Sequence, residues 1–182
     1  TVMGYSTMKR DHSHYAGQIG GLGGKNTNTL AKQTDLAIAI GTKLADFTTG
    51  SWANFENENF KLVSINVSRF DANKHLAQAV VGDAKVSLNE LSIALGNWKA
   101  GEEWNKKSQK ELKAWNEHVD KESAPSNQEI PSYIQVIGAI YKNSDPSDIA
   151  VTAAGGLVGE VIQVWRPREL NTHETEWGFS CM

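Results

Sequence analysis

The residues best placed for chemistry in this chain are glycines that follow predicted strands. Gly155 and Gly156 come directly after DIAVTAA, an apolar run typical of a buried strand, and LVGEVIQVW then predicts a helix. A strand, two glycines and a helix bring main-chain N–H groups to a helix N-terminus, where a phosphate binds favourably. A simple tight turn explains the pattern equally well, so both interpretations stay open.

A second candidate edge follows the apolar run Leu36–Ile40, which also predicts a buried strand ending at Gly41. In open α/β sheets, ligands bind at the carboxyl ends of the strands. The side chains that could contact a nucleotide there are Lys43, Asp46, Thr48 and Thr49. A turn stabilised by its own hydroxyl groups explains these residues equally well.

The remaining motifs favour structural roles. GQIGGLGG does not follow a clear strand, as a dinucleotide fingerprint must, so a flexible or substrate-side loop is favoured over a phosphate cradle. His12, His14 and His75 lack a third ligand at a sensible spacing, so we expect no metal site. Cys181 has no evident base and is interpreted as a structural thiol.

Several aspartates are interpreted as helix caps and turn residues, namely Asp35, Asp71 and Asp83. The chain shows no Ser-His-Asp order, no paired-carboxylate spacing and no Walker loop. We therefore predict no catalytic residue within these 182 residues.

Composition excludes some classes of function. The net charge is −3 and the pI about 5.9, so no basic field points to nucleic acid or to an anionic membrane. No apolar run reaches the roughly 20 residues that span a bilayer. With a single cysteine and no signal-peptide pattern, we expect a cytoplasmic protein with neither nucleic-acid nor membrane partners.

Strands and helices are predicted to alternate along the first half. FKLVSINVS at 60–68 and QAVVGDA at 78–84 give two further strands, and NTNTLAKQT gives a short helix capped by Asn26 or Thr27. Asp83, or alternatively a capping box formed by Ser87 and Glu90, begins a helix that ends at Gly96. TVM is interpreted as the end of a strand. The alternation predicts an α/β layered sheet with right-handed crossovers.

The second half begins with a polar stretch at 97–122 whose sparse apolar residues predict a surface helix, followed by the linker SAPSNQ. Pro131 is expected in the first turn of the next helix, whose apolar stripe is Ile134, Ile137 and Ile140 or Tyr141. One more strand and one more helix follow, and RPRELNTHETEWGFSCM is interpreted as irregular. This second α/β unit looks incomplete and is expected to leave apolar surface exposed.

Several stretches together resemble a known family. ADFTTGSW after AIGTKL, VSINVSRFDANKH and VVGDAKVSLNEL are similar to the central domain of thiamine diphosphate enzymes. FTTGSW and INVSRFDANKH are most similar to the trihydroxycyclohexane-dione hydrolases of myo-inositol breakdown. The resemblance implies a three-layer αβα Rossmann-like parallel sheet.

In that family a pyrimidine-binding, a central and a diphosphate-binding module follow one another. The resemblance therefore divides the chain into a central domain that lacks its beginning at 1–96, a surface helix and linker at 97–127, and the opening of the diphosphate-binding domain at 128–182. It implies thiamine diphosphate and Mg²⁺ as cofactors. The G-D-G…N segment that holds Mg²⁺ and the diphosphate in the family does not occur here.

The resemblance also places cofactor contacts on particular residues. Ala154, Gly155 and Gly156 match a loop that reaches the diphosphate, but Gly156 and Leu157 replace its Gln and His, so only backbone contacts are expected. Ser180 and Met182 fall in a G-x-G-x-M-G turn that meets the thiamine, with Ser180 in place of a glycine. Lys43 stands where flavin-binding relatives have Arg, so no flavin is expected.

The implied activity is hydrolytic cleavage of a C–C bond in a cyclic 1,2-dione, within a homodimer or homotetramer of a longer parent protein. This chain alone is expected to be inactive. Two alternatives remain, an acetohydroxyacid synthase-like decarboxylase and a non-catalytic nucleotide-binding α/β domain. The absent Gln-His pair argues against the decarboxylase.

Overall fold

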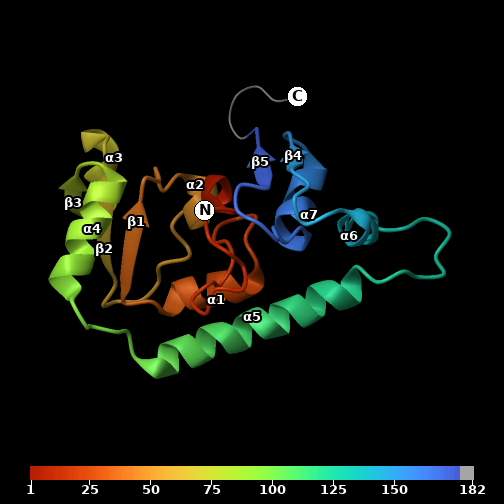
Figure 1. Cartoon of the computed structure of the whole chain (residues 1–182), viewed down its shortest axis with the longest axis horizontal. Coiled ribbons are helices and arrows are strands. Elements are labelled where there is room, and N and C mark those ends of the chain that lie inside the picture. The colour runs from red at the N-terminus through yellow and green to blue at the C-terminus, as the bar shows by residue number, and fades with distance from the viewer. Residues whose placement is uncertain (177–182) are drawn as a thin grey trace.

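The chain forms two parallel sheets with helices packed around them (Figure 1). The computed structural model describes residues 1–176. The first sheet has the order β1 (Leu36–Ile40), β2 (Lys61–Asn66), β3 (Gln78–Val81), and the second pairs β4 (Ala150–Thr152) with β5 (His173–Thr175). The predicted α/β class and the four predicted strands of these sheets are confirmed.

Helices connect the strands, and the longer ones lie where the sequence predicted helices. They are α1 (Lys25–Gln33), α2 (Asp46–Thr49), α3 (Arg69–Ala72), α4 (Ala84–Leu95), α5 (Glu102–Glu122), α6 (Tyr133–Asn143) and α7 (Gly156–Val164), with two 3₁₀ turns, η1 (Val2–Gly4) and η2 (Lys74–Leu76). The short turns α2, α3, η1 and η2 were not predicted, because one turn is too short to show a 3.6-residue period.

Two of the predicted helix ends are confirmed. The Asp83 carboxylate accepts a hydrogen bond from the Val86 main-chain N–H at 3.0 Å and caps α4, so the alternative capping box is not used. Gly96 ends this helix with a φ of +53°, which a glycine adopts without steric cost.

Other predicted ends are wrong. Gly24 is the N-cap of α1, because the side chains of Asn26 and Thr27 instead donate to the carbonyls of Ala16 and Gln18. Ser132 caps α6 in a capping box with Gln135, so Pro131 lies before the helix. The segment TVM forms the turn η1 rather than the end of a strand.

The first strand is less buried than its apolar sequence predicts. Leu36, Ile38 and Ile40 share one face of β1 and stay 43–48% exposed. On the opposite face Ala39 packs in a small core with Leu44 and Leu62. Burial on both faces, as expected for this strand, is therefore not achieved by the described residues.

The best-packed element is α7, which contacts two separate apolar clusters. On one side Val161, Val164 and Trp165 pack with Val119 of α5 and Ile137 of α6. On the other side Val158 and Ile162 pack with Val2, and Leu22 of the glycine-rich loop lies against them. The N-terminal segment therefore packs on the second unit of the chain.

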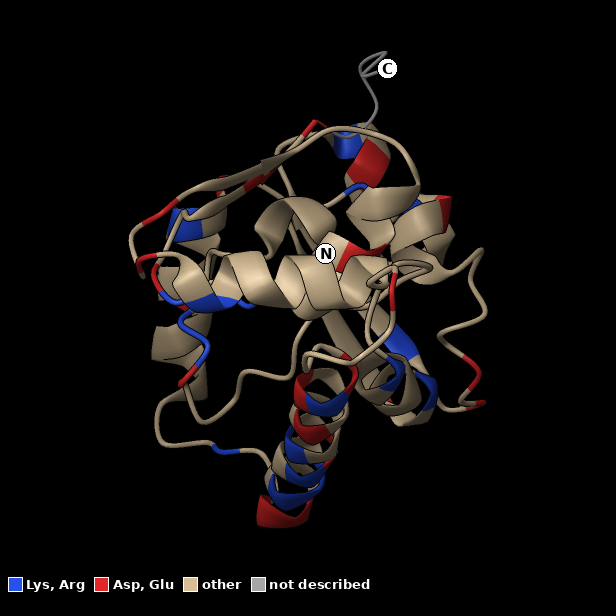
Figure 2. Ribbon diagram, turned by 90° about the vertical axis from the view of Figure 1, so that its right-hand side faces the viewer, with Lys and Arg blue, Asp and Glu red and all other residues tan. Residues whose placement is uncertain are grey.

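Helix α5 runs alongside both units (Figure 1). Its Gln109 side chain donates to the carbonyl of Ser13 at 2.6 Å, and its Val119 lies in the α6–α7 core. Lysines and acidic residues are interleaved along it (Figure 2), which fits the predicted surface helix. None of the helices within residues 1–176 is long and apolar enough to cross a membrane.

The core around α7 can be tested within α6. We expect Ile137→Ala to lower the free energy of unfolding by about 2–5 kcal/mol, because the Ile137 side chain is only 3% exposed and its removal leaves a cavity. The matched control Ile140→Ala, at a site that is 57% exposed, should change it by less than about 0.5 kcal/mol. Urea denaturation followed by circular dichroism measures both values, and equal losses would contradict the packing described.

Candidate functional site

The N-terminus of α7 is an open group of main-chain donors at the end of β4. Gly155 is the N-cap residue with a φ of +130°, which favours glycine, and no side chain within residues 1–176 caps the helix. Residues 153–157 are exposed, and a Cβ added at Gly155 or Gly156 would meet no atom within 4 Å. The first turn of α7 carries no acidic residue, so the positive end of the helix is not neutralised from within. An anion can therefore approach these N–H groups, as the phosphate interpretation requires.

The loop before α7 is positioned by the pairing of β4 with β5. The hydroxyl groups of Thr152 and Thr175 hydrogen-bond to each other across the two strands, and the Glu176 N–H donates to the Thr152 carbonyl at 2.8 Å. The strand β5 falls in the stretch interpreted as irregular, so that prediction was wrong. Its sequence HET has no apolar pattern, and it becomes a strand by pairing with β4.

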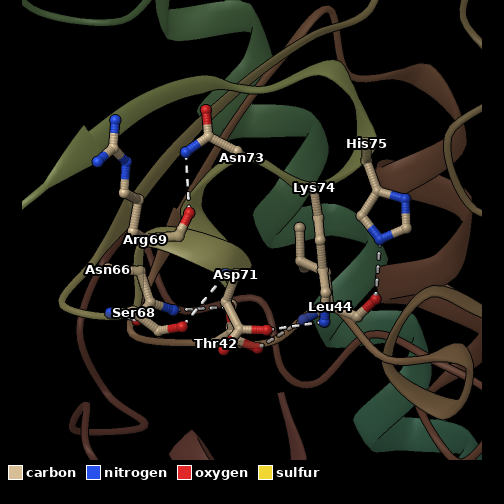
Figure 3. Close-up of polar contacts among 9 residues, drawn as sticks. All are labelled: Thr42, Leu44, Asn66, Ser68, Arg69, Asp71, Asn73, Lys74 and His75. Atoms are coloured by element: carbon tan, nitrogen blue, oxygen red, sulfur yellow. Dashed lines mark hydrogen bonds and ion pairs between the residues drawn. The ribbon is translucent and has the colours of Figure 1, made fainter.

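The carboxyl ends of β1 and β2 form a second polar cluster (Figure 3). Asn66 donates from its side chain to the Thr42 carbonyl at 3.3 Å and accepts from the Ser68 N–H at 2.9 Å. Ser68 caps α3 by accepting from the Asp71 N–H at 3.3 Å. These bonds hold the loops at this edge against one another.

An ion pair extends this cluster to η2. The Lys74 ammonium lies 2.7 Å from the Asp71 carboxylate. The hydrogen bond from Lys74, then that from Ser68, holds the pKa of Asp71 below its ordinary value. Sequence reasoning interpreted Asp71 as a turn residue and missed Lys74. The Ser68-x-x-Asp71 spacing, which matches a capping box, is the signal that could have located the start of α3.

His75 closes the cluster from the side of η2. Its ring stacks on Trp52, with the centroids 4.0 Å apart, and its Nε2 lies 3.3 Å from the Leu44 carbonyl oxygen. Trp52, Leu44 and His75 all have positive φ values, an uncommon conformation for residues with side chains. No local pattern in the sequence predicted this contact between separate loops.

The four predicted nucleotide contacts at this edge are not brought together as one site. Thr49 is buried and its hydroxyl accepts from the Trp52 N–H at 3.0 Å, which supports the interpretation as a self-stabilised turn. Asp46 and Thr48 belong to the short helix α2, whereas Lys43 lies in the loop before it and is exposed. The charge of Lys43 contributes, as the last of several causes, to the lowered pKa of Asp71.

The glycine-rich loop is closely packed. The Asn28 side chain accepts from the Gly20 N–H and donates to the Gly20 carbonyl, both at 2.9 Å. A Cβ at Gly20 would lie 2.2 Å from the Phe47 carbonyl oxygen, so only glycine fits there. The loop thus uses its glycines for close approach to other main chain. Of the predicted flexible or substrate-side loop, flexibility does not fit this close packing.

The histidines do not form a metal centre in the described part of the chain. His14 contacts Asn105 of α5 at 3.1 Å, and its main-chain N–H is donated to His12. Among residues 1–176 no group of three His, Cys, Asp or Glu side chains is close enough to hold a metal ion. The predicted cofactor contacts Ser180 and Met182, and the thiol of Cys181, lie outside the described residues.

Comparison with known proteins assigns the family. Residues 1–91 match the family described as thiamine pyrophosphate enzyme, central domain. The chain belongs to the thiamine pyrophosphate enzymes. The predicted resemblance, and the α/β fold that it implied, are confirmed.

Curated relatives match the whole of this chain and indicate which members of the family it is similar to. The chain is 33% identical over 203 residues to the 3D-(3,5/4)-trihydroxycyclohexane-1,2-dione hydrolase of Geobacillus thermodenitrificans. It is 32% identical to that of Bacillus anthracis and 34% identical to the first such enzyme of Bacillus cereus. All of this chain is covered in each case, but it spans only 32% of the length of those relatives.

The Asp71–Lys74 pair gives a testable pH dependence. Because the folded-state pKa of Asp71 is lowered, the ion pair stabilises the fold above the ordinary value of 3.8 and loses this effect as the pH falls through the lowered pKa. We expect Asp71→Asn to lower Tm at pH 7, and the gap to wild type to shrink below pH 3.8. In a Lys74→Met background the same substitution should have a smaller effect. A gap of constant size from pH 7 to pH 2.5 would contradict this account.

Proposed function

We propose that the protein carrying this chain is a thiamine diphosphate-dependent hydrolase that cleaves a C–C bond of trihydroxycyclohexane-1,2-dione, giving a deoxy-glucuronic acid in myo-inositol breakdown. The supporting observation is the identity of 32–34% across all of this chain to hydrolases of that name, within a family that uses the cofactor. By the same resemblance, the working enzyme is a homodimer or homotetramer.

Within the described residues, Ala154, Gly155 and Gly156 are our candidates for holding the diphosphate. The uncapped and exposed N-terminus of α7 suits a group with several negative oxygens. Thiamine diphosphate, when bound, supplies an electron sink for C–C cleavage. The proposed role of this loop is to orient the diphosphate through main-chain N–H donors, because Gly156 and Leu157 offer no polar side chain. Ser180 and Met182 are proposed to contact the thiamine part.

We infer that the 182 residues alone bind the cofactor weakly and are inactive. They contain no Gly-Asp-Gly segment to hold Mg²⁺, and main-chain contacts from one helix end are few. Titrating the purified chain with thiamine diphosphate and Mg²⁺ by calorimetry should give no binding tighter than about 100 μM, which corresponds to roughly 5.5 kcal/mol. Micromolar binding would overturn this inference.

The proposed activity is tested on the protein expressed from the gene that encodes this chain. With thiamine diphosphate and Mg²⁺ it should consume trihydroxycyclohexane-1,2-dione and release the ring-opened acid, measured by chromatography. Pyruvate tests the acetohydroxyacid synthase-like alternative, since only that activity would release CO₂ from it. If neither substrate reacts and the 182-residue chain binds ATP or ADP, the hypothesis of a nucleotide-binding domain replaces that of an enzyme.

A charge placed at the start of α7 tests the diphosphate site in the same protein. Gly156→Asp puts a carboxylate where the diphosphate is proposed to lie, and we expect it to raise the KM for thiamine diphosphate at least about tenfold. The matched control Gly156→Asn has nearly the same shape without the charge, so its increase should be much smaller. Because an acidic residue in the first turn stabilises a helix, Tm should not fall in Gly156→Asp. Equal KM values for both variants would contradict the proposed diphosphate site at the start of α7.

A further inference from the structure

A small cavity of about 20 Å³ lies away from both candidate edges, where five parts of the chain meet. Its walls come from the N-terminal segment, the glycine-rich loop, α1, α5 and α7 with the residues that follow it. The polar side chains in these walls include Arg10, Tyr15, Gln18 and Arg166. All of the lining residues lie in the described part of the chain, and none of them is acidic.

Several polar groups at this cavity have no partner. Gln18 is only 4% exposed, yet neither its side-chain nitrogen nor its oxygen makes a hydrogen bond within the described residues. The Nε of Arg166 is also buried without a partner there. Buried polar groups in folded proteins are nearly always hydrogen-bonded, so these atoms indicate an occupant of the cavity.

The cavity also carries an excess of positive charge. Arg10 donates to the Asn116 side-chain oxygen at 2.7 Å, but within residues 1–176 no carboxylate lies within salt-bridge distance of its guanidinium. Arg166 pairs with Asp120, which does not line the cavity. Burial and, second, the charge of Arg166 lower the pKa of Arg10. Two arginines thus line one space, and Asp120 is the one carboxylate that pairs with either of them within the described residues.

We propose that this cavity binds one small monovalent anion of the size of chloride between Arg10 and Arg166, with the Gln18 amide as a further donor. A volume of about 20 Å³ leaves room for one small ion and is small for phosphate, sulfate or a carboxylate ligand. A water molecule would satisfy the amide of Gln18 but would leave the partly buried charge of Arg10 without a counter-ion.

The bound anion joins distant parts of the chain. Arg10 belongs to the N-terminal segment, and Arg166 follows α7 in the second unit. Nearby, the Tyr5 hydroxyl donates to the Trp165 carbonyl at 2.7 Å, so the same two segments are already in contact. The anion therefore strengthens the contact between the two units and should raise the stability of the whole chain.

The first test measures Tm of the 182-residue chain in sodium gluconate, chloride and bromide at equal ionic strength. Chloride and bromide should raise Tm over gluconate by about 2–4 °C once they exceed the Kd roughly fivefold, and the rise should saturate. Arg10→Gln should abolish this halide-specific rise. The matched control Arg168→Gln should keep it, because Arg168 is exposed, bonds to Ser144 and Asp145 and does not line the cavity.

The second test does not depend on a variant that folds. Crystals of the wild-type chain grown with bromide should give an anomalous peak between the guanidinium groups of Arg10 and Arg166. Absence of that peak, or equal Tm values in all three salts, overturns the proposal. A peak without a saturable halide-specific rise in Tm marks an adventitious ion only, and overturns it as well.

Discussion

The burial of α7 from two sides is the constraint on which the rest of the structure depends. Ile162 is only 2% exposed and packs against Val2 of the N-terminal segment, whereas Val161 packs against residues of α5 and α6. A helix held on two adjoining faces cannot shift without disturbing one of the two clusters. Since α7 begins directly after β4, this packing also fixes where its N-terminal donors lie.

The same packing explains the composition of the N-terminal segment. Leu22 approaches α7 so closely that a Cβ on Gly159 would lie 3.3 Å from its Cδ2, so the small residue in the helix allows the contact. Ser6 donates to the His173 carbonyl at 3.3 Å and accepts from the Asn171 N–H with its own carbonyl at 3.0 Å. The N-terminal part of the chain is thus held against the second unit by close packing on α7 and by main-chain hydrogen bonds near β5.

Prediction from the sequence succeeded where a local pattern decides the structure. The apolar runs of β1, β2 and β4 and the cap at Asp83 depend on neighbouring residues, and each was found. The strand β5, the stacking of Trp52 on His75 and the pairing of Lys74 with Asp71 were missed. These features depend on loops and strands that meet only in the folded chain, or on a helix of a single turn.

Solvent exposure was the other property that the sequence predicted poorly. An unbroken apolar run such as LAIAI is typical of a strand covered on both faces, but coverage depends on what packs against it. Here the larger side chains of β1 remain partly exposed while the alanines between them pack with Leu44 and Leu62. The class of the element was therefore predictable, and its environment was not.

The two candidate edges differ in how many hydrogen-bonding groups remain free for a ligand. At the ends of β1 and β2 the polar side chains already have partners. Asn66 bonds to the main chain of Thr42 and Ser68, Ser68 accepts from the Asp71 N–H, and Asp71 pairs with Lys74, so a ligand would have to replace existing bonds. At the start of α7 no side chain in the described part of the chain caps the helix, so a ligand gains contacts there without such a loss. Main-chain N–H groups, however, bind any phosphate and do not select a substrate. The fold is therefore compatible with the proposed diphosphate site, whereas the proposed cyclic dione substrate rests on relatedness and not on geometry.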